Sequence, residues 1–475
     1  MLDRAAAHGE QGDSVPVTGP LPAGQLGELP IGDGTAPLYV LPFDKAGAPQ
    51  APVTAERVRA AVAAGITDVL LLSHGWNTDW QRAVGFYRRF VAAFDRTVRE
   101  HGSPRTPLRP LVVGVSWPSI ALPESTAPMM AGAPGGSPEP DAPAGELAAE
   151  LVAPRDRPEF AALVGSEALG PAAARRLAQL LGPLYGHVDD ELPAPDPGAP
   201  TDPVSDVDDT LATWAAVQER LAEVDGPLVV SGPSGARRSR ARASRAPTAA
   251  SMSGAALVGA LSPRNIVRMA TVLLMKDRAG VVGRYGVGPQ LGAILDAAPG
   301  VRVHLVGHSY GCKVLLAAAC SPGLPRPVRS ALLLQPALSY LALADDVPEL
   351  GVPGGYSAAK HRCELPIMVT WSRRDVALHD IFPLAVRRRS DLGERGVAAA
   401  GAESPPTPFA AMGGWGPHRA PDVEDVPIRQ PGDGPYRVDG GHRVLALDGN
   451  RTISGHGDVV GESTAWALHT LMAQD

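Results

Sequence analysis

The sequence predicts an α/β fold in which a mostly parallel sheet is flanked by helices. Short apolar runs of strand length alternate with longer segments of helical periodicity. The run at 68–73 is almost entirely apolar, which is typical of a strand buried on both faces of a parallel sheet. With 475 residues, of which 44% are hydrophobic, the chain is long enough for one large domain that carries an insertion or for two domains.

The elements follow in order along the chain. Residues 1–35 are rich in glycine and proline and predict a flexible leader. The first part of the core, 36–118, is expected to contain strands at 37–41, 68–73 and 111–117. Its helices are expected at 55–64 and 79–100, and Thr54 is the expected N-cap of the first. The second part, 300–475, is expected to contain strands at 301–306, 331–334, 366–371 and 443–447 and helices after 311 and at 463–472.

Residues 119–299 interrupt this alternation and predict an insertion into the core. It begins with a low-complexity stretch at 119–145, and its later helical patterns carry apolar faces. The arginine-rich run 233–249 is interpreted as a disordered surface loop. The alternative is that it binds an anionic surface. We expect the insertion to be mostly helical and to cover the site as a cap.

Composition excludes several classes of protein. The formal net charge of -7 argues against a nucleic-acid partner. The three cysteines form neither a disulfide framework nor a metal-ligand spacing. The N-terminus lacks an apolar signal sequence, and no stretch approaches the roughly 20 apolar residues of a membrane span. The cytoplasm is therefore the expected location, and the composition gives no oligomeric state.

The most specific pattern of the chain is VRVHLVGHSYG at 301–311. An apolar strand leads into G-x-S-x-G, and an apolar helical run follows at 314–319. Strand, sharp turn and helix are the setting of a nucleophile elbow, which exposes a serine hydroxyl at the end of its strand. Side chains larger than those of Gly307 and Gly311 would crowd the crossing. The pattern predicts Ser309 as a nucleophile; the competing interpretation is an ordinary glycine-rich turn.

A serine hydroxyl needs a base to take its proton and an acid to orient that base. At such elbows the acid and then the base follow at the ends of later strands. Asp375 lies in the loop after the strand 366–371 and is the predicted acid, with Asp380 as the alternative. An aspartate that only caps the next helix is the competing interpretation. His456, in a glycine-flanked loop after the strand 443–447, is the predicted base.

The strand 68–73 ends in a His-Gly-Trp-Asn loop that predicts an oxyanion hole. One donor of such a hole is the amide after the nucleophile, and the other lies in an early strand–helix loop. These are the backbone N–H groups of Tyr310 and Trp76. Gly75 would allow close approach of a substrate, and His74 is expected to be structural. A plain turn before a helix is the alternative interpretation of this loop.

Together, His74-Gly75, the Gly307–Gly311 elbow, Asp375 and His456 resemble the α/β-hydrolase superfamily. The strand 112–118 and the loop Gly455-His456-Gly457-Asp458 look like those of bacterial serine hydrolases of uncharacterised substrate. The resemblance covers roughly 36–118 and 300–475. It implies an α/β-hydrolase fold and a Ser-Asp-His triad, with no cofactor and no metal. The long insertion departs from a minimal hydrolase and leaves the substrate open.

The expected activity is hydrolysis of a carboxylic ester, of small-molecule or lipid type, through an acyl-enzyme. Thioesters and amides remain open as substrates. One alternative is an acyltransferase that uses the same residues with an alcohol or amine in place of water. The other is a non-catalytic binding protein on a hydrolase fold. Labelling by a fluorophosphonate would distinguish the non-catalytic binding protein from the two enzymes. Product analysis would distinguish the hydrolase from the acyltransferase.

Overall fold

The computed structural model describes residues 24–119, 150–166, 168–185, 207, 210–211, 214–215, 263–347, 352–385, 410–417 and 422–474. Within these residues the chain has an α/β architecture, which confirms the fold class expected from alternating apolar strands and helices. Much of the segment between 119 and 263, including the basic run 233–249, lies outside the described residues.

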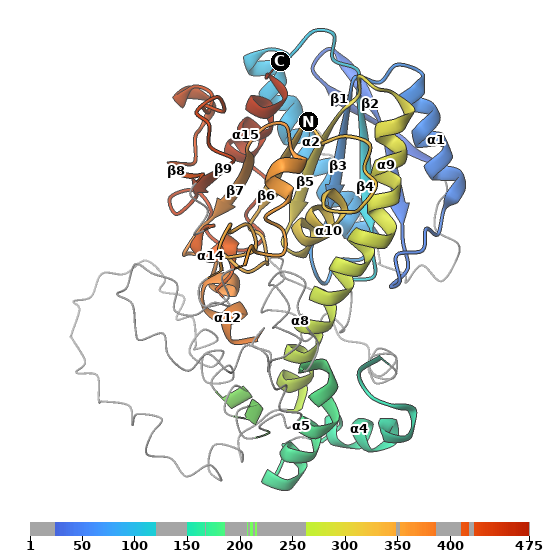
Figure 1. Cartoon of the computed structure of the whole chain (residues 1–475), viewed down its shortest axis with the longest axis vertical. Helices are drawn as coiled ribbons and strands as arrows, with labels where there is room; N and C mark the ends of the chain where they lie inside the picture. The colour runs from blue at the N-terminus through green and yellow to red at the C-terminus, as the bar shows by residue number, and fades with distance from the viewer. Residues whose placement is uncertain are drawn as a thin grey trace, which may run out of the picture.

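Nine strands of the described chain form one mixed sheet in the order β1-β2-β4-β3-β5-β6-β7-β9-β8 (Figure 1). The strands are β1 (Gln25–Ile31), β2 (Gly34–Pro42), β3 (Asp68–Ser73), β4 (Pro110–Ser116), β5 (Arg302–His308), β6 (Ser330–Leu334), β7 (Ile367–Trp371), β8 (Val423–Pro427) and β9 (Val444–Asp448). Neighbouring strands are parallel, except that β1 is antiparallel to β2. Ser73 lies opposite Gly307, and His308 lies opposite Leu334. The carboxyl ends of the central strands therefore meet at one edge of the sheet.

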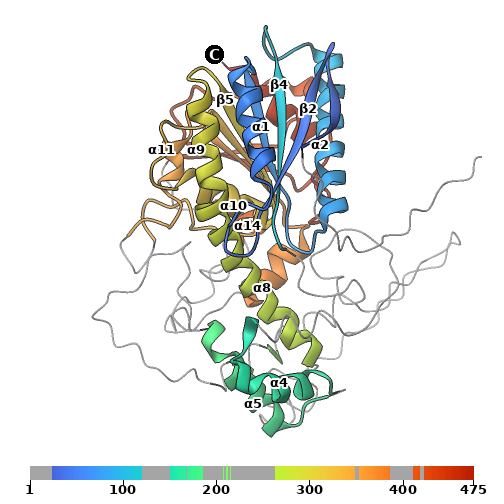
Figure 2. The ribbon, with the colours of Figure 1, turned by 90° about the vertical axis from the view of Figure 1, so that its right-hand side faces the viewer.

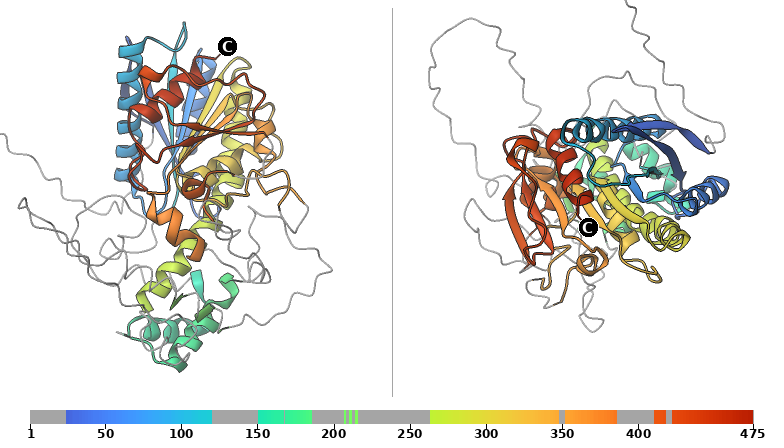
Figure 3. Two further views of the ribbon diagram at one scale, coloured as in Figure 1. Left: turned by 90° about the vertical axis from the view of Figure 1, so that its left-hand side faces the viewer. Right: turned by 90° about the horizontal axis from the view of Figure 1, so that it is seen from above.

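Helices cover both faces of the sheet because alternate strand residues point to opposite sides. Leu70 and Leu72 belong to an apolar cluster with α2 (Trp80–His101) and α15 (Glu462–Met472). Val69 and Leu71 belong to the cluster on the other face, with α1 (Pro52–Ala63), α9 (Gly288–Ala297) and α10 (Tyr310–Ala319). Seen from above, the sheet runs between these two groups of helices (Figure 3). The core therefore has two apolar layers.

The other helical segments of the described chain lie mostly in the connections. They are η2 (Pro154–Asp156), α4 (Arg157–Val164), α5 (Pro171–Tyr185), α8 (Pro263–Val281), η4 (Val282–Val287), α11 (Ala359–Arg362), η5 (Ala377–Ile381), α12 (Phe382–Ala385), α14 (Met412–Trp415) and η6 (Pro431–Asp433). No described helix has both the length and the apolar composition that a bilayer-spanning segment requires.

The amino-terminal part corrects two predictions. The flexible leader expected over 1–35 is wrong from residue 24 onward, because β1 forms there and pairs with β2. β1 is mostly exposed and lacks the apolar run by which the central strands are recognised. Thr54, expected as an N-cap, lies inside α1, where its hydroxyl oxygen accepts the N–H of Gly24 at 2.8 Å. Residues 1–23 lie outside the described residues.

After β4 the chain leaves the sheet and later returns along one continuous run of helix. α4 and α5 pack against α8 at a distance from the sheet (Figure 1). α8 continues through the π-helical turn η4 into α9, which lies beside the sheet (Figure 2). Leu291, Ile294 and Leu295 of α9 are buried, and this helix packs on α1 and α10. The boundary expected at 299 therefore comes too late, because α9 already belongs to the helical layer of the core.

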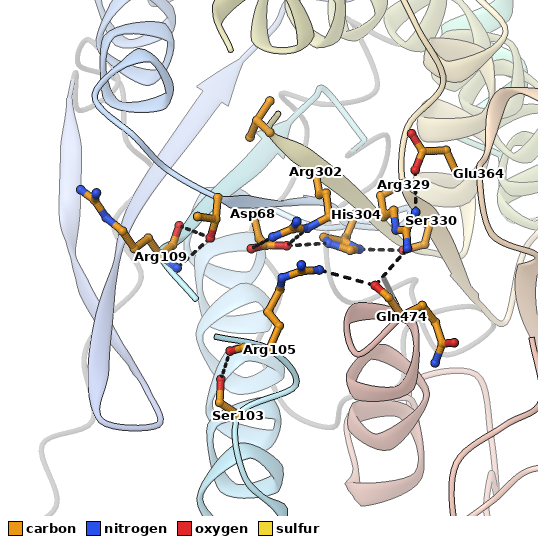
Figure 4. Close-up of polar contacts among 12 residues, drawn as sticks. Asp68, Ser103, Arg105, Arg109, Arg302, His304, Arg329, Ser330, Glu364 and Gln474 are labelled. Carbon is orange, nitrogen blue, oxygen red and sulfur yellow. Dashed lines mark hydrogen bonds and ion pairs between the residues drawn. The ribbon is translucent and has the colours of Figure 1, made fainter. Parts of the chain in front are cut away.

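A buried polar network joins the amino ends of β3, β5 and β6 (Figure 4). Arg302 donates two hydrogen bonds to the carboxylate of Asp68, at 2.8 and 2.9 Å. The His304 ring bridges Asp68, at 3.2 Å, and the hydroxyl of Ser330, at 2.8 Å. Burial disfavours the ionised carboxyl of Asp68, but the hydrogen bonds from His304 and Arg302 outweigh it and hold its pKa well below the usual range. Burial also lowers the pKa of His304, although the hydrogen bond with Asp68 acts in the opposite direction. The network lies at the edge of the sheet opposite to Ser309.

Candidate active site

Ser309 occupies the turn between β5, which ends at His308, and α10, which begins at Tyr310. Its backbone has φ 57° and ψ -126°, a conformation that non-glycine residues rarely adopt and that is strained. A Cβ on Gly307 would lie 2.8 Å from the backbone N of Cys312. A Cβ on Gly311 would overlap the carbonyl oxygens that end β3. The tight crossing therefore requires both glycines and holds the serine in its strained turn.

The structure brings the three residues expected from the sequence into one hydrogen-bonded chain. Nε2 of His456 lies 2.9 Å from Oγ of Ser309, and Nδ1 lies 2.8 Å from Oδ2 of Asp375. All three residues are buried, with Asp375 fully so. Since an ionised carboxylate only accepts, Nδ1–H donates to Asp375 and Nε2 is left to accept the serine proton. A carboxylate, an imidazole and a hydroxyl are thus joined in one continuous chain of hydrogen bonds.

Asp375, and not Asp380, is the carboxylate that contacts the base. Asp375 follows β7 in a turn whose amide at Leu378 donates to Oδ1 at 3.1 Å. Oδ1 of Asp380 instead lies 3.0 Å from Nδ1 of His379. Of the two predicted acids, Asp375 is therefore the one that lies within hydrogen-bonding distance of His456.

The His-Gly loop after β3 packs directly against the serine. A Cβ on Gly75 would lie 2.7 Å from the Cβ of Ser309. His74 is held by its own hydrogen bonds: Nδ1 lies 2.9 Å from the carbonyl oxygen of Gly75, and Nε2 accepts the backbone N–H of Trp117 at 3.3 Å. Burial lowers the pKa of His74 to about 4, so the ring is neutral. His74 shapes the loop, as expected, and Gly75 leaves room for the serine.

The two amides expected to form an oxyanion hole lie in the segments that flank Ser309. Tyr310 is the first residue of α10, directly after the serine. Trp76 follows the glycine that contacts Ser309, and no acceptor for its backbone N–H lies among the described residues. Its indole Nε1 is also buried without a partner in the described part of the chain. Two unsatisfied donors therefore sit in the loop beside the serine.

Two side chains of the site were missed or underestimated from the sequence. His308 precedes the serine at the end of β5, and its Nε2 lies 2.9 Å from the backbone carbonyl oxygen of His456 and therefore donates to it. Burial lowers the pKa of His308 to about 3, so the ring stays neutral. Gln335 was not considered, although it directly follows β6 at the same edge of the sheet. Its Nε2 donates to Asp375 at 3.2 Å. The carboxyl-edge rule that selected Asp375 would also have selected Gln335.

No group of three or more metal-ligating side chains is arranged to hold a metal ion within the described residues. In comparisons with protein-family models, with curated proteins and with solved structures, nothing matches this chain. The geometry of the site is therefore the basis on which a function can be proposed.

Proposed function

We propose that this protein is a serine hydrolase of the α/β-hydrolase fold that cleaves a carboxylic ester. The observation that carries the proposal is the continuous hydrogen-bonded chain from Asp375 through His456 to Ser309. The chain ends on a serine held at a strained strand–helix turn. The order of the three residues along the sequence and their origin at the ends of β5, β7 and β9 also fit this class of enzyme.

The reaction follows from the positions of the protons. Ser309 Oγ attacks the ester carbonyl carbon while His456 Nε2 takes the hydroxyl proton. Asp375 stabilises the resulting imidazolium through its hydrogen bond to Nδ1. The backbone amides of Trp76 and Tyr310 bind the oxyanion of the tetrahedral intermediate. The intermediate collapses to an acyl-serine, and the departing alkoxide takes the proton from His456.

Water completes the cycle by the same route. His456 removes a proton from a water molecule as its oxygen attacks the acyl carbon. The second tetrahedral intermediate releases the carboxylic acid, and Ser309 Oγ recovers its proton from the imidazolium. An alcohol or amine in place of water would make the protein an acyltransferase, so the products of the second step decide between the two activities.

We further propose that the segment containing α4 and α5 is a cap that shapes the acyl pocket. Tyr310 connects the elbow to α8, on which α4 and α5 pack, because its hydroxyl donates to the carbonyl oxygen of Val272 in α8 at 3.0 Å. Replacing residues 120–262 with a short linker should change the preference among ester chain lengths. An unchanged preference in a folded, active variant would contradict a role of this segment in the pocket.

Labelling with a fluorophosphonate tests the proposed nucleophile. The wild-type protein should become labelled on Ser309, and Ser309→Ala should lose both labelling and hydrolysis of 4-nitrophenyl esters while staying folded. Ser330→Ala is the matched control, because Ser330 is as buried as Ser309 and also lies 2.8 Å from a histidine nitrogen, but it lies at the opposite edge of the sheet. Labelling that survives Ser309→Ala, or that is absent from the wild type, would overturn the assignment.

A further inference from the structure

A buried amide side chain stands behind the acid of the site. Gln335 follows β6 directly, and none of its surface is exposed to solvent. Its backbone has φ 45°, which places a non-glycine residue in the sparsely populated left-handed region. Such strain persists only where the surroundings over-determine the conformation.

Hydrogen bonds fix the orientation of the Gln335 amide. Its Nε2 donates to Oδ2 of Asp375 at 3.2 Å and to the carbonyl oxygen of Gly413 at 3.0 Å. Its Oε1 accepts the hydroxyl proton of Thr370 at 2.9 Å, and the same hydroxyl oxygen accepts the backbone N–H of Gln335. A flipped amide would point its oxygen at a carboxylate and a carbonyl, which are both acceptors. Only the observed orientation lets the amide bond to the carboxylate, the carbonyl and the hydroxyl together.

The contact with Asp375 involves the oxygen that also serves the base. Oδ2 receives the Nδ1–H of His456 at 2.8 Å and an N–H of Gln335 at 3.2 Å. Oδ1 receives the backbone N–H of Leu378 at 3.1 Å. With both oxygens held, the carboxylate cannot rotate away from the imidazole without breaking a hydrogen bond to a charged group.

We propose that Gln335 is a positioning residue that holds the Asp375 carboxylate toward His456. The inference rests on the proposed function, since it concerns the acid of that site. Gln335 touches neither the substrate nor the reacting atoms and acts only through Asp375. Its N–H keeps Oδ2 in line with Nδ1 of the imidazole, and Thr370 keeps the N–H, rather than the oxygen, facing the carboxylate.

Two substitutions of similar size separate positioning from mere packing. Gln335→Met fills the space but cannot donate, so kcat should fall about tenfold at every pH with KM little changed. Gln335→Glu can donate to Asp375 only while the new carboxyl carries a proton, and its ionised form repels Asp375. The ratio of kcat/KM for this variant to wild type should therefore fall about tenfold or more between pH 5.5 and 8.5.

The neighbouring titratable group does not mimic this effect. His308 also lies beside the His456 ring, with 5.0 Å between ring centres, but burial lowers its pKa to about 3, well below the pH range of the assay. Gln50→Glu makes the same chemical change at an exposed loop, where Nε2 donates to the nearby carbonyl oxygen of Ala48. The activity ratio of this control should stay near one across the pH range.

The experiment measures kcat and KM for a 4-nitrophenyl ester in each folded variant, with active sites counted by fluorophosphonate titration. A flat ratio for Gln335→Glu, or a kcat for Gln335→Met within twofold of wild type, would overturn the positioning role. A wild-type protein that is neither labelled at Ser309 nor active on esters would instead overturn the proposed function, and the two failures are thus distinguishable.

Discussion

Replacing Gly75 with alanine is expected to disable the serine without altering any member of the hydrogen-bonded chain. The new Cβ would lie 2.7 Å from the Cβ of Ser309 and 3.2 Å from the carbonyl oxygen of His308. Carbon atoms in contact lie about 3.5 Å apart or more, so the two Cβ atoms must separate by about 0.8 Å. Oγ of Ser309 is 2.9 Å from Nε2 of His456. A shift of that size away from the imidazole breaks the hydrogen bond.

The magnitude follows from this displacement. Misplacing a reacting group by about 1 Å costs about 100-fold in rate, whereas overpacking a core costs about 1–3 kcal/mol of stability. For Gly75→Ala we therefore expect kcat/KM on a 4-nitrophenyl ester to fall about 100-fold, in parallel with the rate of fluorophosphonate labelling, while thermal unfolding stays cooperative. Gly300→Ala is the control, because its Cβ would meet no atom of the described residues within 4 Å, and its activity should be unchanged. A folded Gly75→Ala protein with wild-type kcat/KM would refute the reasoning.

Three further predictions concern other residues of the fold and the site. Asp375→Asn should lower kcat by up to about 10⁴-fold, because it disturbs the tautomer and charge of the base. Asp380→Asn should lower kcat far less. If steady-state kinetics gave the reverse ranking, Asp380 would be the acid. His308→Phe keeps an aromatic ring but loses the N–H that donates to the His456 carbonyl, so kcat should fall about tenfold. An unchanged kcat would show that this hydrogen bond is not needed for activity. Asp68→Asn should lower the free energy of unfolding by about 2 kcal/mol at pH 7. Because the pKa of Asp68 is held below its usual value, its ionised form stabilises the fold above about pH 4, and this contribution is lost as the pH falls further. In urea unfolding, the difference in unfolding free energy between the wild type and Asp68→Asn should therefore become smaller at low pH. A difference that does not change with pH would contradict this prediction.

Local chain geometry is what the sequence by itself determined. A strand, a sharp turn and a helix depend on neighbouring residues, so the pattern at 301–311 located Ser309 in its turn without any knowledge of distant contacts. Strand ends are also local features, and in a parallel sheet they meet at one edge. Asp375 and His456 could thus be expected near the serine from their positions after β7 and β9 alone.

Contacts between distant segments were decided only by the tertiary structure. β1 and β8 exist because each pairs with a neighbouring strand, and their own sequences carry too little apolar pattern to reveal them. Helix α9 belongs to the core because its apolar face meets α1 and α10, whereas periodicity alone cannot say which surface a helix covers.

The same limit applies inside the site. The contact from Gln335 to Asp375 spans 40 residues of sequence, and that from His308 to His456 spans 148. Sequence spacing carries no information on which of several groups at a shared edge face one another. Those pairings depend on the order of the strands in the sheet and on the side-chain packing between them, and both arise only when the chain folds.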